Sequence, residues 1–226
     1  MHGTRFAWLS KTIARLAVLA WLGTLLGCGS GPATTATGVP YYNTPDFTPL
    51  WLADSAAVAR TVTHWIDPFA FRDQTNALVT PRTIAGKVHV ANFFFTACPS
   101  ICPKMTGLMR AVQDTFRDDP RVLLLSYSVT PWVDSVARLK QYADQEGIKA
   151  DKWHLLTGDR GQLYTLARRS YFAEERIGFT RDSTEFLHTE HLILVDETRR
   201  IRGIYNGTQP QEIDHLIADI RALLGR

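Results

Sequence analysis

The chain has 226 residues, of which 45% are hydrophobic and 21% charged, proportions typical of a globular protein with one main domain. Three of its 25 basic residues lie before Cys28, so the rest of the chain carries 22 basic and 22 acidic side chains. A near-neutral chain without a cluster of lysines and arginines offers no electrostatic basis for nucleic-acid binding.

The first 27 residues have the layout of a secretory signal peptide: three basic residues, no acidic residue, and an apolar run over 16–26. The run is shorter than the ~20 apolar residues that a membrane span needs. Cys28 follows a small residue at the end of the run, as in the lipobox of bacterial lipoproteins, in which the cysteine is lipidated and becomes the new N-terminus. We therefore expect a lipid anchor at Cys28. A plain cleaved signal and an uncleaved anchor are the alternatives.

Residues 28–40 are small and polar without periodicity, which predicts a flexible tether between the anchor and one domain over 41–226. This organisation implies an exported protein held on the extracytoplasmic side of a membrane, either in the periplasm or on the cell surface.

The start of the domain is predicted to be largely extended. Residues 41–51 are rich in aromatic residues and proline and are expected at the domain edge, whereas 53–62 fits no single pattern. Turn-forming residues at 73–76 separate the strand-like segments 66–72 and 77–80, which predicts a β-hairpin.

From residue 87 onward, apolar runs of strand length alternate with segments whose apolar residues recur at helical spacing. The predicted strands span 87–95, 122–129, 153–156, 191–195 and 202–205, and the predicted helices span 100–116, 133–146, 160–170 and 211–224. This order predicts an α/β protein with a thioredoxin-like fold and an N-terminal β-hairpin extension.

Cys98 and Cys102 lie where the predicted strand 87–95 turns into a helix. Reactive groups of such sheets collect at the carboxyl ends of the strands, and a helix N-terminus stabilises a thiolate. Because side chains four residues apart share a helix face, the two sulfurs could chelate one soft metal ion. They could also form a disulfide if the first turn is irregular, as Pro99 favours. The three-residue spacer favours metal, since thioredoxin-type redox motifs have two residues between the cysteines.

Three other interpretations of the cysteine pair remain open. A structural disulfide suits an exported protein, but it would close a very short loop and stabilise the fold little. Buried free thiols rarely stay reduced in an oxidising compartment. A peroxidatic site is the third possibility, because Thr96 stands just ahead of Cys98.

A third soft-metal ligand would be sought among the histidines. His188 and His191 precede the apolar residues 192–195 of the next predicted strand, and in a thioredoxin fold the loop entering this strand lies beside the cysteine loop. Either ring could face the thiolates or be an ordinary structural histidine. The other histidines are expected in structural or solvated positions, or in the signal peptide: His2, His64, His89, His154 and His215.

Four segments together resemble the Sco/SenC family of copper chaperones over roughly residues 65–224. They are the segments 94–105, which contains a CPxxCP motif, 126–131, 155–158 and 188–196, which has a histidine eight residues before an aspartate. The resemblance implies a thioredoxin-like fold and copper ligation by Cys98, Cys102 and His188. It also implies a role in metallating the dinuclear copper site of cytochrome c oxidase subunit II.

The implied ligand set could bind copper as Cu(I) or Cu(II), because two thiolates suit Cu(I) and an added imidazole lets a site hold Cu(II). His191 falls at a variable position and is expected outside the ligand set. Many members have an acidic residue in the loop after the second strand, where this chain has Asp134 close by. Met105 and Met109 are soft donors, but their helical spacing predicts core packing.

The sequence therefore predicts a membrane-anchored copper chaperone whose partner is cytochrome c oxidase subunit II or a related copper protein. The alternative is an enzyme, a thiol–disulfide oxidoreductase that uses Cys98 and Cys102 to keep the oxidase cysteines reduced. His188 distinguishes the two hypotheses, since disulfide exchange has no need of it. A copper-dependent redox sensor is a third hypothesis, which the sequence does not separate from the first.

Overall fold

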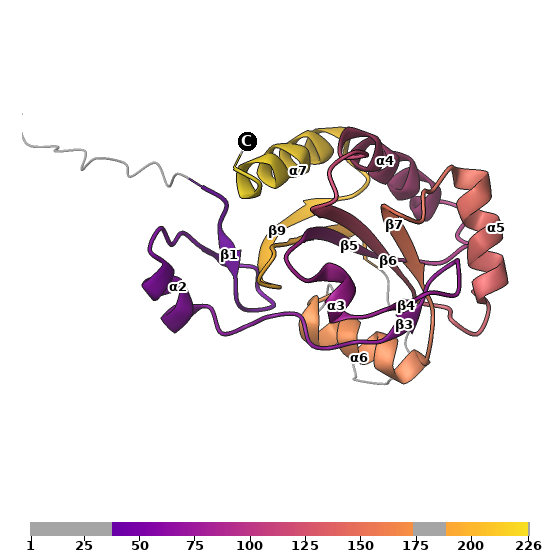
Figure 1. Ribbon diagram of the computed structural model, residues 1–226, viewed down its shortest axis with the longest axis horizontal. Coiled ribbons are helices and arrows are strands. Elements are labelled where there is room, and N and C mark those ends of the chain that lie inside the picture. The colour runs from indigo at the N-terminus through magenta and orange to yellow at the C-terminus, as the bar shows by residue number, and fades with distance from the viewer. Residues whose placement is uncertain (1–37, 174–188, 226) are drawn as a thin grey trace, which may run out of the picture. The chain divides into compact units, whose positions relative to one another are not determined.

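The structure is a computed structural model that describes residues 38–173 and 189–225. The predictions for the signal peptide, Cys28, most of the tether and His188 lie outside these residues. The described part is a mixed α/β domain in which one central sheet lies between helices, as Figure 1 shows, and the predicted thioredoxin-like fold is confirmed. No helix within the described ranges is long and apolar enough to cross a membrane.

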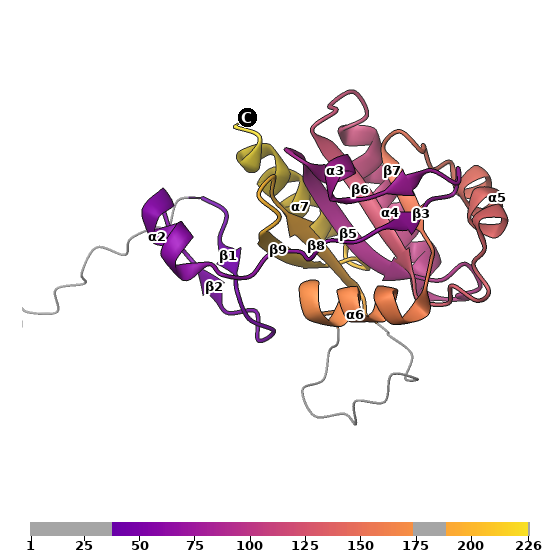
Figure 2. The ribbon, with the colours of Figure 1, turned by 60° about the horizontal axis from the view of Figure 1, so that its bottom comes forward.

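The central sheet has seven strands in the order β2-β1-β9-β8-β5-β6-β7. Strands β5, β6 and β7 are parallel, and β8, β9, β1 and β2 continue the sheet in antiparallel pairs on the other side of β5. Figure 2 shows β1 and β2 extending the sheet beyond β9. The strands are β1 (Tyr41–Tyr42), β2 (Pro49–Leu50), β5 (Val88–Phe94), β6 (Val122–Ser128), β7 (Trp153–Leu156), β8 (His191–Val195) and β9 (Ile201–Asn206).

Helices cover both faces of this sheet, and each face has its own apolar core. One core packs side chains of α4, α5 and α7 against the sheet, and the other contains those of α3 and α6. All seven residues of β5 and of β6 are buried, which explains their near-continuous apolar sequence. The helices are α2 (Ser55–Thr61), α3 (Pro81–Ile84), α4 (Ile101–Thr115), α5 (Val136–Glu146), α6 (Arg160–Ser170) and α7 (Pro210–Leu223).

The predicted hairpin is present as two short strands, β3 (Phe71–Arg72) and β4 (Leu78–Val79). Its turn covers part of the free edge of β7. The side chain of Gln74 donates to the carbonyl of Trp153 at 2.7 Å and accepts from the N–H of Leu155 at 2.8 Å, as a neighbouring strand would. Because an exposed edge strand invites pairing with other chains, this contact protects the sheet.

The structure differs from the predicted elements at three places. Helix α5 begins at Val136 rather than at 133, because residues 130–134 form a turn and Ser135 caps the helix. The ambiguous segment 53–62 contains α2, capped by the carboxylate of Asp54. The short helix α3, which starts at a proline after the capping residue Thr80, was not predicted.

Candidate metal centre

Cys98 and Cys102 lie at the carboxyl edge of the parallel strands, as predicted. Strand β5 ends at Phe94, a loop carries Cys98, and Cys102 is the second residue of α4. Cys98 is half-buried, whereas Cys102 is 7% exposed and packs in the core beneath the helix. Both are free thiols. The pair therefore joins one sulfur that solvent reaches to one that the fold encloses.

The sulfur of Cys98 takes the place of a helix cap. Ser100 stands at the N-cap of α4 but makes no side-chain capping bond. The N–H of Cys102 donates instead to Sγ of Cys98, at 3.3 Å. The first N–H groups of a helix have no partner within the helix, so a thiolate at this position satisfies them and meets the positive end of the helix dipole.

This arrangement gives the two thiols opposite acidities. Partial burial raises the pKa of Cys98, but hydrogen bonds from the N–H groups of Ser100, Cys102 and Ile101 outweigh it, so its pKa is lowered overall. Burial, and the hydrogen bond of its thiol to Cys98, raise the pKa of Cys102 to about 12. Cys98 is therefore the more reactive thiol, and Cys102 keeps its proton until a metal or a disulfide displaces it.

A buried carboxylate fixes the loop that carries Cys98. Asp134 has no exposed surface. It accepts hydrogen bonds from the hydroxyl of Ser128 at 2.6 Å and from that of Thr130 at 3.0 Å. Thr96 adds two more, from its N–H at 3.3 Å and its hydroxyl at 2.5 Å. The Nε of Arg138 donates to the same Thr96 hydroxyl at 2.5 Å. The cysteine loop is thereby joined, two residues before Cys98, to the end of β6, the turn after it and the first turn of α5.

The third predicted ligand is not placed by the structure, because His188 lies outside the described residues. Thr189 follows it, and His191 is the first residue of β8. The ring of His191 packs edge-on against that of Phe47, with the ring centroids 5.9 Å apart. Within the ranges 38–173 and 189–225, no three His, Cys, Asp or Glu side chains are grouped to hold a metal ion. The structure thus brings Cys98 and Cys102 together, and metal ligation by these two thiols and by His188 remains a prediction.

The remaining candidate ligands have structural surroundings. Met105 and Met109 are fully buried in the core with Cys102, as their spacing predicted. The histidines bond elsewhere: His64 to the carbonyl of Ser170, His89 to the hydroxyl of Tyr171, His154 to the carboxylate of Asp73, and His215 lies on the surface near Glu212.

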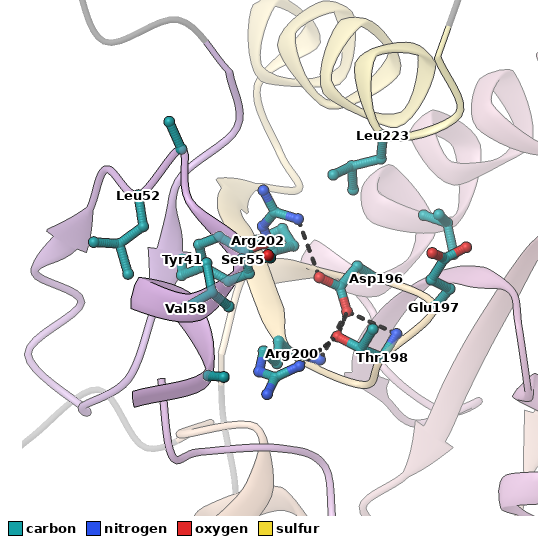
Figure 3. A pocket seen from close by; sticks show the side chains of 13 residues that line it. Tyr41, Leu52, Ser55, Val58, Asp196, Glu197, Thr198, Arg200, Arg202 and Leu223 are labelled. Carbon is teal, nitrogen blue, oxygen red and sulfur yellow. Dashed lines mark hydrogen bonds and ion pairs between the residues drawn. The ribbon is translucent and has the colours of Figure 1, made fainter. Parts of the chain in front are cut away.

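A separate cavity of about 370 Å³ lies between the N-terminal segment, the β8–β9 turn and α7 (Figure 3). Arg202 stacks on the ring of Tyr41, with its guanidinium carbon 3.7 Å from the ring centroid, and pairs with Asp196 at 3.0 Å. The cavity is lined by Val88, the first residue of β5, and so lies at the opposite end of that strand from Cys98. Arg202 also donates to the carbonyls of Val39 and Pro40, so it fastens the N-terminal segment to the sheet.

Comparison with known proteins points to one family. The SCO1/SenC family model matches residues 57–225, close to the range expected from the motifs. The chain is 29% identical over 159 residues to the SCO1 protein homolog of Bacillus subtilis, covering 70% of this chain and 81% of that protein.

Solved structures agree with this match. BsSco, described as having a disulfide switch and as a member of the Sco family of cytochrome c oxidase assembly proteins, is 28% identical. It superposes with a TM-score of 0.60 over 71% of this chain and 93% of that chain. ScoI of Bradyrhizobium japonicum, solved with copper bound, is 25% identical with a TM-score of 0.51 over 67% of this chain and 96% of that chain.

Proposed function

Because the chain belongs to the SCO1/SenC family, we propose that it binds copper through Cys98, Cys102 and His188 and delivers it during assembly of cytochrome c oxidase. Sco proteins are associated with copper and with oxidase assembly. The observation that carries the proposal is the thiol pair at the start of α4, where Cys98 accepts a hydrogen bond from the N–H of Cys102.

The donor set fits copper as a cargo. Soft thiolate sulfurs select Cu(I), and the loop before α4 brings the sulfur of Cys98 to within 3.3 Å of the backbone nitrogen of Cys102, in the first turn of that helix. Metal binding displaces the proton that Cys102 otherwise keeps, so affinity should rise with pH. His188 would add the nitrogen donor that also suits Cu(II).

Unequal exposure of the two sulfurs suits transfer. A ligand from a partner can approach Cys98, which solvent reaches, while Cys102 stays in the core. Copper would then pass by ligand exchange that begins at Cys98. The partner is proposed to be cytochrome c oxidase subunit II or a related exported copper protein, and lipidation of Cys28 would hold the chain at the membrane where such proteins are assembled.

The opposite acidities of the thiols favour a second candidate function, thiol–disulfide exchange. The Cys98 thiolate would attack a disulfide of the client, forming a mixed disulfide and releasing one client thiolate. Cys102 would then give up its proton and attack the Cys98 sulfur. This step forms the Cys98–Cys102 disulfide and releases the second client thiolate, so the client is reduced as the pair is oxidised. The disulfide switch described for BsSco supports this candidate.

Anaerobic copper titration of the reduced chain from residue 28, with Cys28→Ser to prevent lipidation, separates the two functions. We expect one equivalent of copper, loss of the thiolate-to-copper absorption in Cys98→Ser and Cys102→Ser, and an altered Cu(II) spectrum in His188→Ala. His191→Ala is the matched control and should behave as the parent. Failure to bind copper specifically, together with a readily cycled disulfide, would overturn the carrier and favour the oxidoreductase.

A further inference from the structure

Two neighbouring apolar side chains are exposed beside the cysteine loop. Trp132 is 59% exposed and Val133 is 40% exposed, and both lie in the turn between β6 and α5. The turn is bonded to the cysteine loop, because the N–H of Val129 donates to the carbonyl of Phe94 at 2.9 Å and Asp134 accepts from Thr96. Ala97 and Pro99 on the cysteine loop and Pro103 at the start of α4 are exposed as well. We call these exposed residues of the two bonded segments the Trp132 surface: Ala97, Pro99, Pro103, Trp132 and Val133.

The turn that presents Trp132 is held rigidly. The N–H groups of Val133 and Asp134 both donate to the carbonyl of Thr130, at 2.8 and 2.9 Å. The hydroxyl of Tyr164, on α6, donates to the carbonyl of Val129 at 2.7 Å. A backbone that is already ordered loses little conformational entropy when a partner covers it, so the turn that carries Trp132 is prepared for an interface.

Cations border the same surface. The guanidinium of Arg160 lies over the ring of Trp132 at 4.8 Å and over that of Tyr164 at 5.1 Å. Arg138 is bonded to Thr96 on the cysteine loop, and Lys104 is exposed on the first turn of α4. The carboxylate of Asp134 is buried beneath them, while that of Asp159 caps α6 beside Arg160. Tryptophan and arginine are the residues most often found at the energetic centre of protein interfaces.

The chemistry of copper transfer determines which kind of partner must cover the Trp132 surface. A protein that takes copper from Cys98 has to bring its own ligand into the same coordination sphere, within a few ångström of the sulfur. It must therefore lie over Ala97 and Pro99, the chain neighbours of Cys98, and close to the turn that Asp134 bonds to Thr96. Lys104 and Arg138 are exposed and Arg160 is half-exposed, while Arg138 also pairs with Asp134 at 3.7 Å. Cations at the border favour a partner whose contact area is apolar at the centre and carries carboxylates at its rim.

We propose that the Trp132 surface, with Arg160 beside it, is the docking site for an exported copper protein that is apolar at its contact centre and acidic around it. The inference rests on the proposed function. Docking supplies affinity for the partner, and the sulfurs hold the cargo, so the two contributions can be separated by experiment.

The experiment compares copper transfer to a protein with transfer to a small molecule. The copper-loaded chain is mixed with the soluble copper domain of the same organism's oxidase subunit II, or with the Cu(I) chelator bathocuproine disulfonate. Trp132→Ala should slow transfer to the protein by about tenfold or more while leaving transfer to the chelator unchanged. Trp51→Ala is the matched control, since Trp51 is 51% exposed and does not belong to the surface. Arg160→Gln should reduce the salt dependence of the protein transfer rate.

The outcomes distinguish this inference from the proposed function. Equal transfer rates for Trp132→Ala and Trp51→Ala, with copper binding intact, would overturn the docking site alone. If the parent chain binds no copper, the proposed function fails. The same variants are then compared in disulfide exchange with the oxidised domain and with glutathione disulfide, where a loss in Trp132→Ala confined to the domain again supports docking. Lost vesicle binding by Trp132→Ala with unchanged protein transfer would assign the surface to a membrane and contradict the proposal.

Discussion

Thr96 and Asp134, 38 residues apart in the chain, are joined by two hydrogen bonds that fix the cysteine loop to the turn after β6. Asp134→Ala would remove the carboxylate that accepts these bonds. The hydroxyl of Ser128 and the N–H of Thr96 would then lose this hydrogen-bond acceptor. Since each buried group left unpaired costs about 1–3 kcal/mol, unfolding by urea should show a loss of about 2–4 kcal/mol. Copper affinity should fall as well, because the loop that carries Cys98 loses its support.

The control for Asp134 is Asp144, an exposed carboxylate that pairs with Lys140 on the surface of α5. Exposed pairs of this kind contribute little, so Asp144→Ala should change stability by less than about 0.5 kcal/mol. Similar losses for the two variants would contradict the role assigned to the buried carboxylate.

Two glycines make a second matched pair. A Cβ on Gly203 would overlap the hydroxyl of Tyr205, whose ring folds back over the glycine and donates to Asp219 at 2.6 Å. Gly203→Ala should therefore displace the ring and lower stability by about 1–3 kcal/mol. Gly107, inside α4, has open space around its Cβ position, and Gly107→Ala should stabilise the protein by up to about 1 kcal/mol. Thermal unfolding of both variants tests the contrast, which fails if they shift in the same direction.

The sequence predicts the elements whose burial pattern is local. Strand β7 and helix α6 have the predicted bounds, because alternation, apolar runs and capping residues are properties of a few neighbouring residues. Helix α5 begins three residues after its predicted start. Val133 fits the helical pattern, but the turn before the helix is fixed by Asp134, whose partners Thr96 and Ser128 come from other segments. No local signal reveals such a contact.

The candidate site, too, has features that the sequence predicts and features that depend on distant contacts. The position of Cys98 and Cys102 follows from a strand that turns into a helix, so the sequence alone places them at the edge of the sheet. Their unequal burial was not predicted, because it depends on how α4 packs against the sheet and α7. The sequence does not predict the proposed docking role of Trp132 either, since nothing local to the turn indicates that Thr96 and Arg160 lie next to it.

The protein should become less stable as the pH is lowered, because of His89. This residue is fully buried in β5, and its Nδ1 has no hydrogen-bond partner among the described residues. Burial lowers its pKa from 6.5 to about 3, although the charge of Asp196 opposes the shift. Below pH 6.5 the unfolded chain binds a proton that the folded chain does not, so stability present above that pH is lost as the pH falls toward 3. The loss should approach about 1.4 kcal/mol per pH unit.

Urea unfolding of His89→Leu between pH 7 and 5 tests this linkage. The variant should lose less stability over this range than the parent, whatever its stability at pH 7. His215→Gln, at an exposed position, should keep the slope of the parent. Parallel curves for the parent and His89→Leu would show that another group causes the acid sensitivity.

The unequal exposure of the two thiols predicts the order in which they react. Cys98 is half-buried with a lowered pKa, whereas Cys102 is 7% exposed and its pKa is raised to about 12. Iodoacetamide at pH 7 should alkylate Cys98 roughly tenfold or more faster, as peptide mass spectrometry would show, because the thiolate is the reacting form. The Cys98→Ser variant reports the rate of Cys102 alone. One equivalent of Cu(I) should slow the reaction at Cys98 if copper is held there, and equal rates at the two thiols would contradict the geometry at the start of α4.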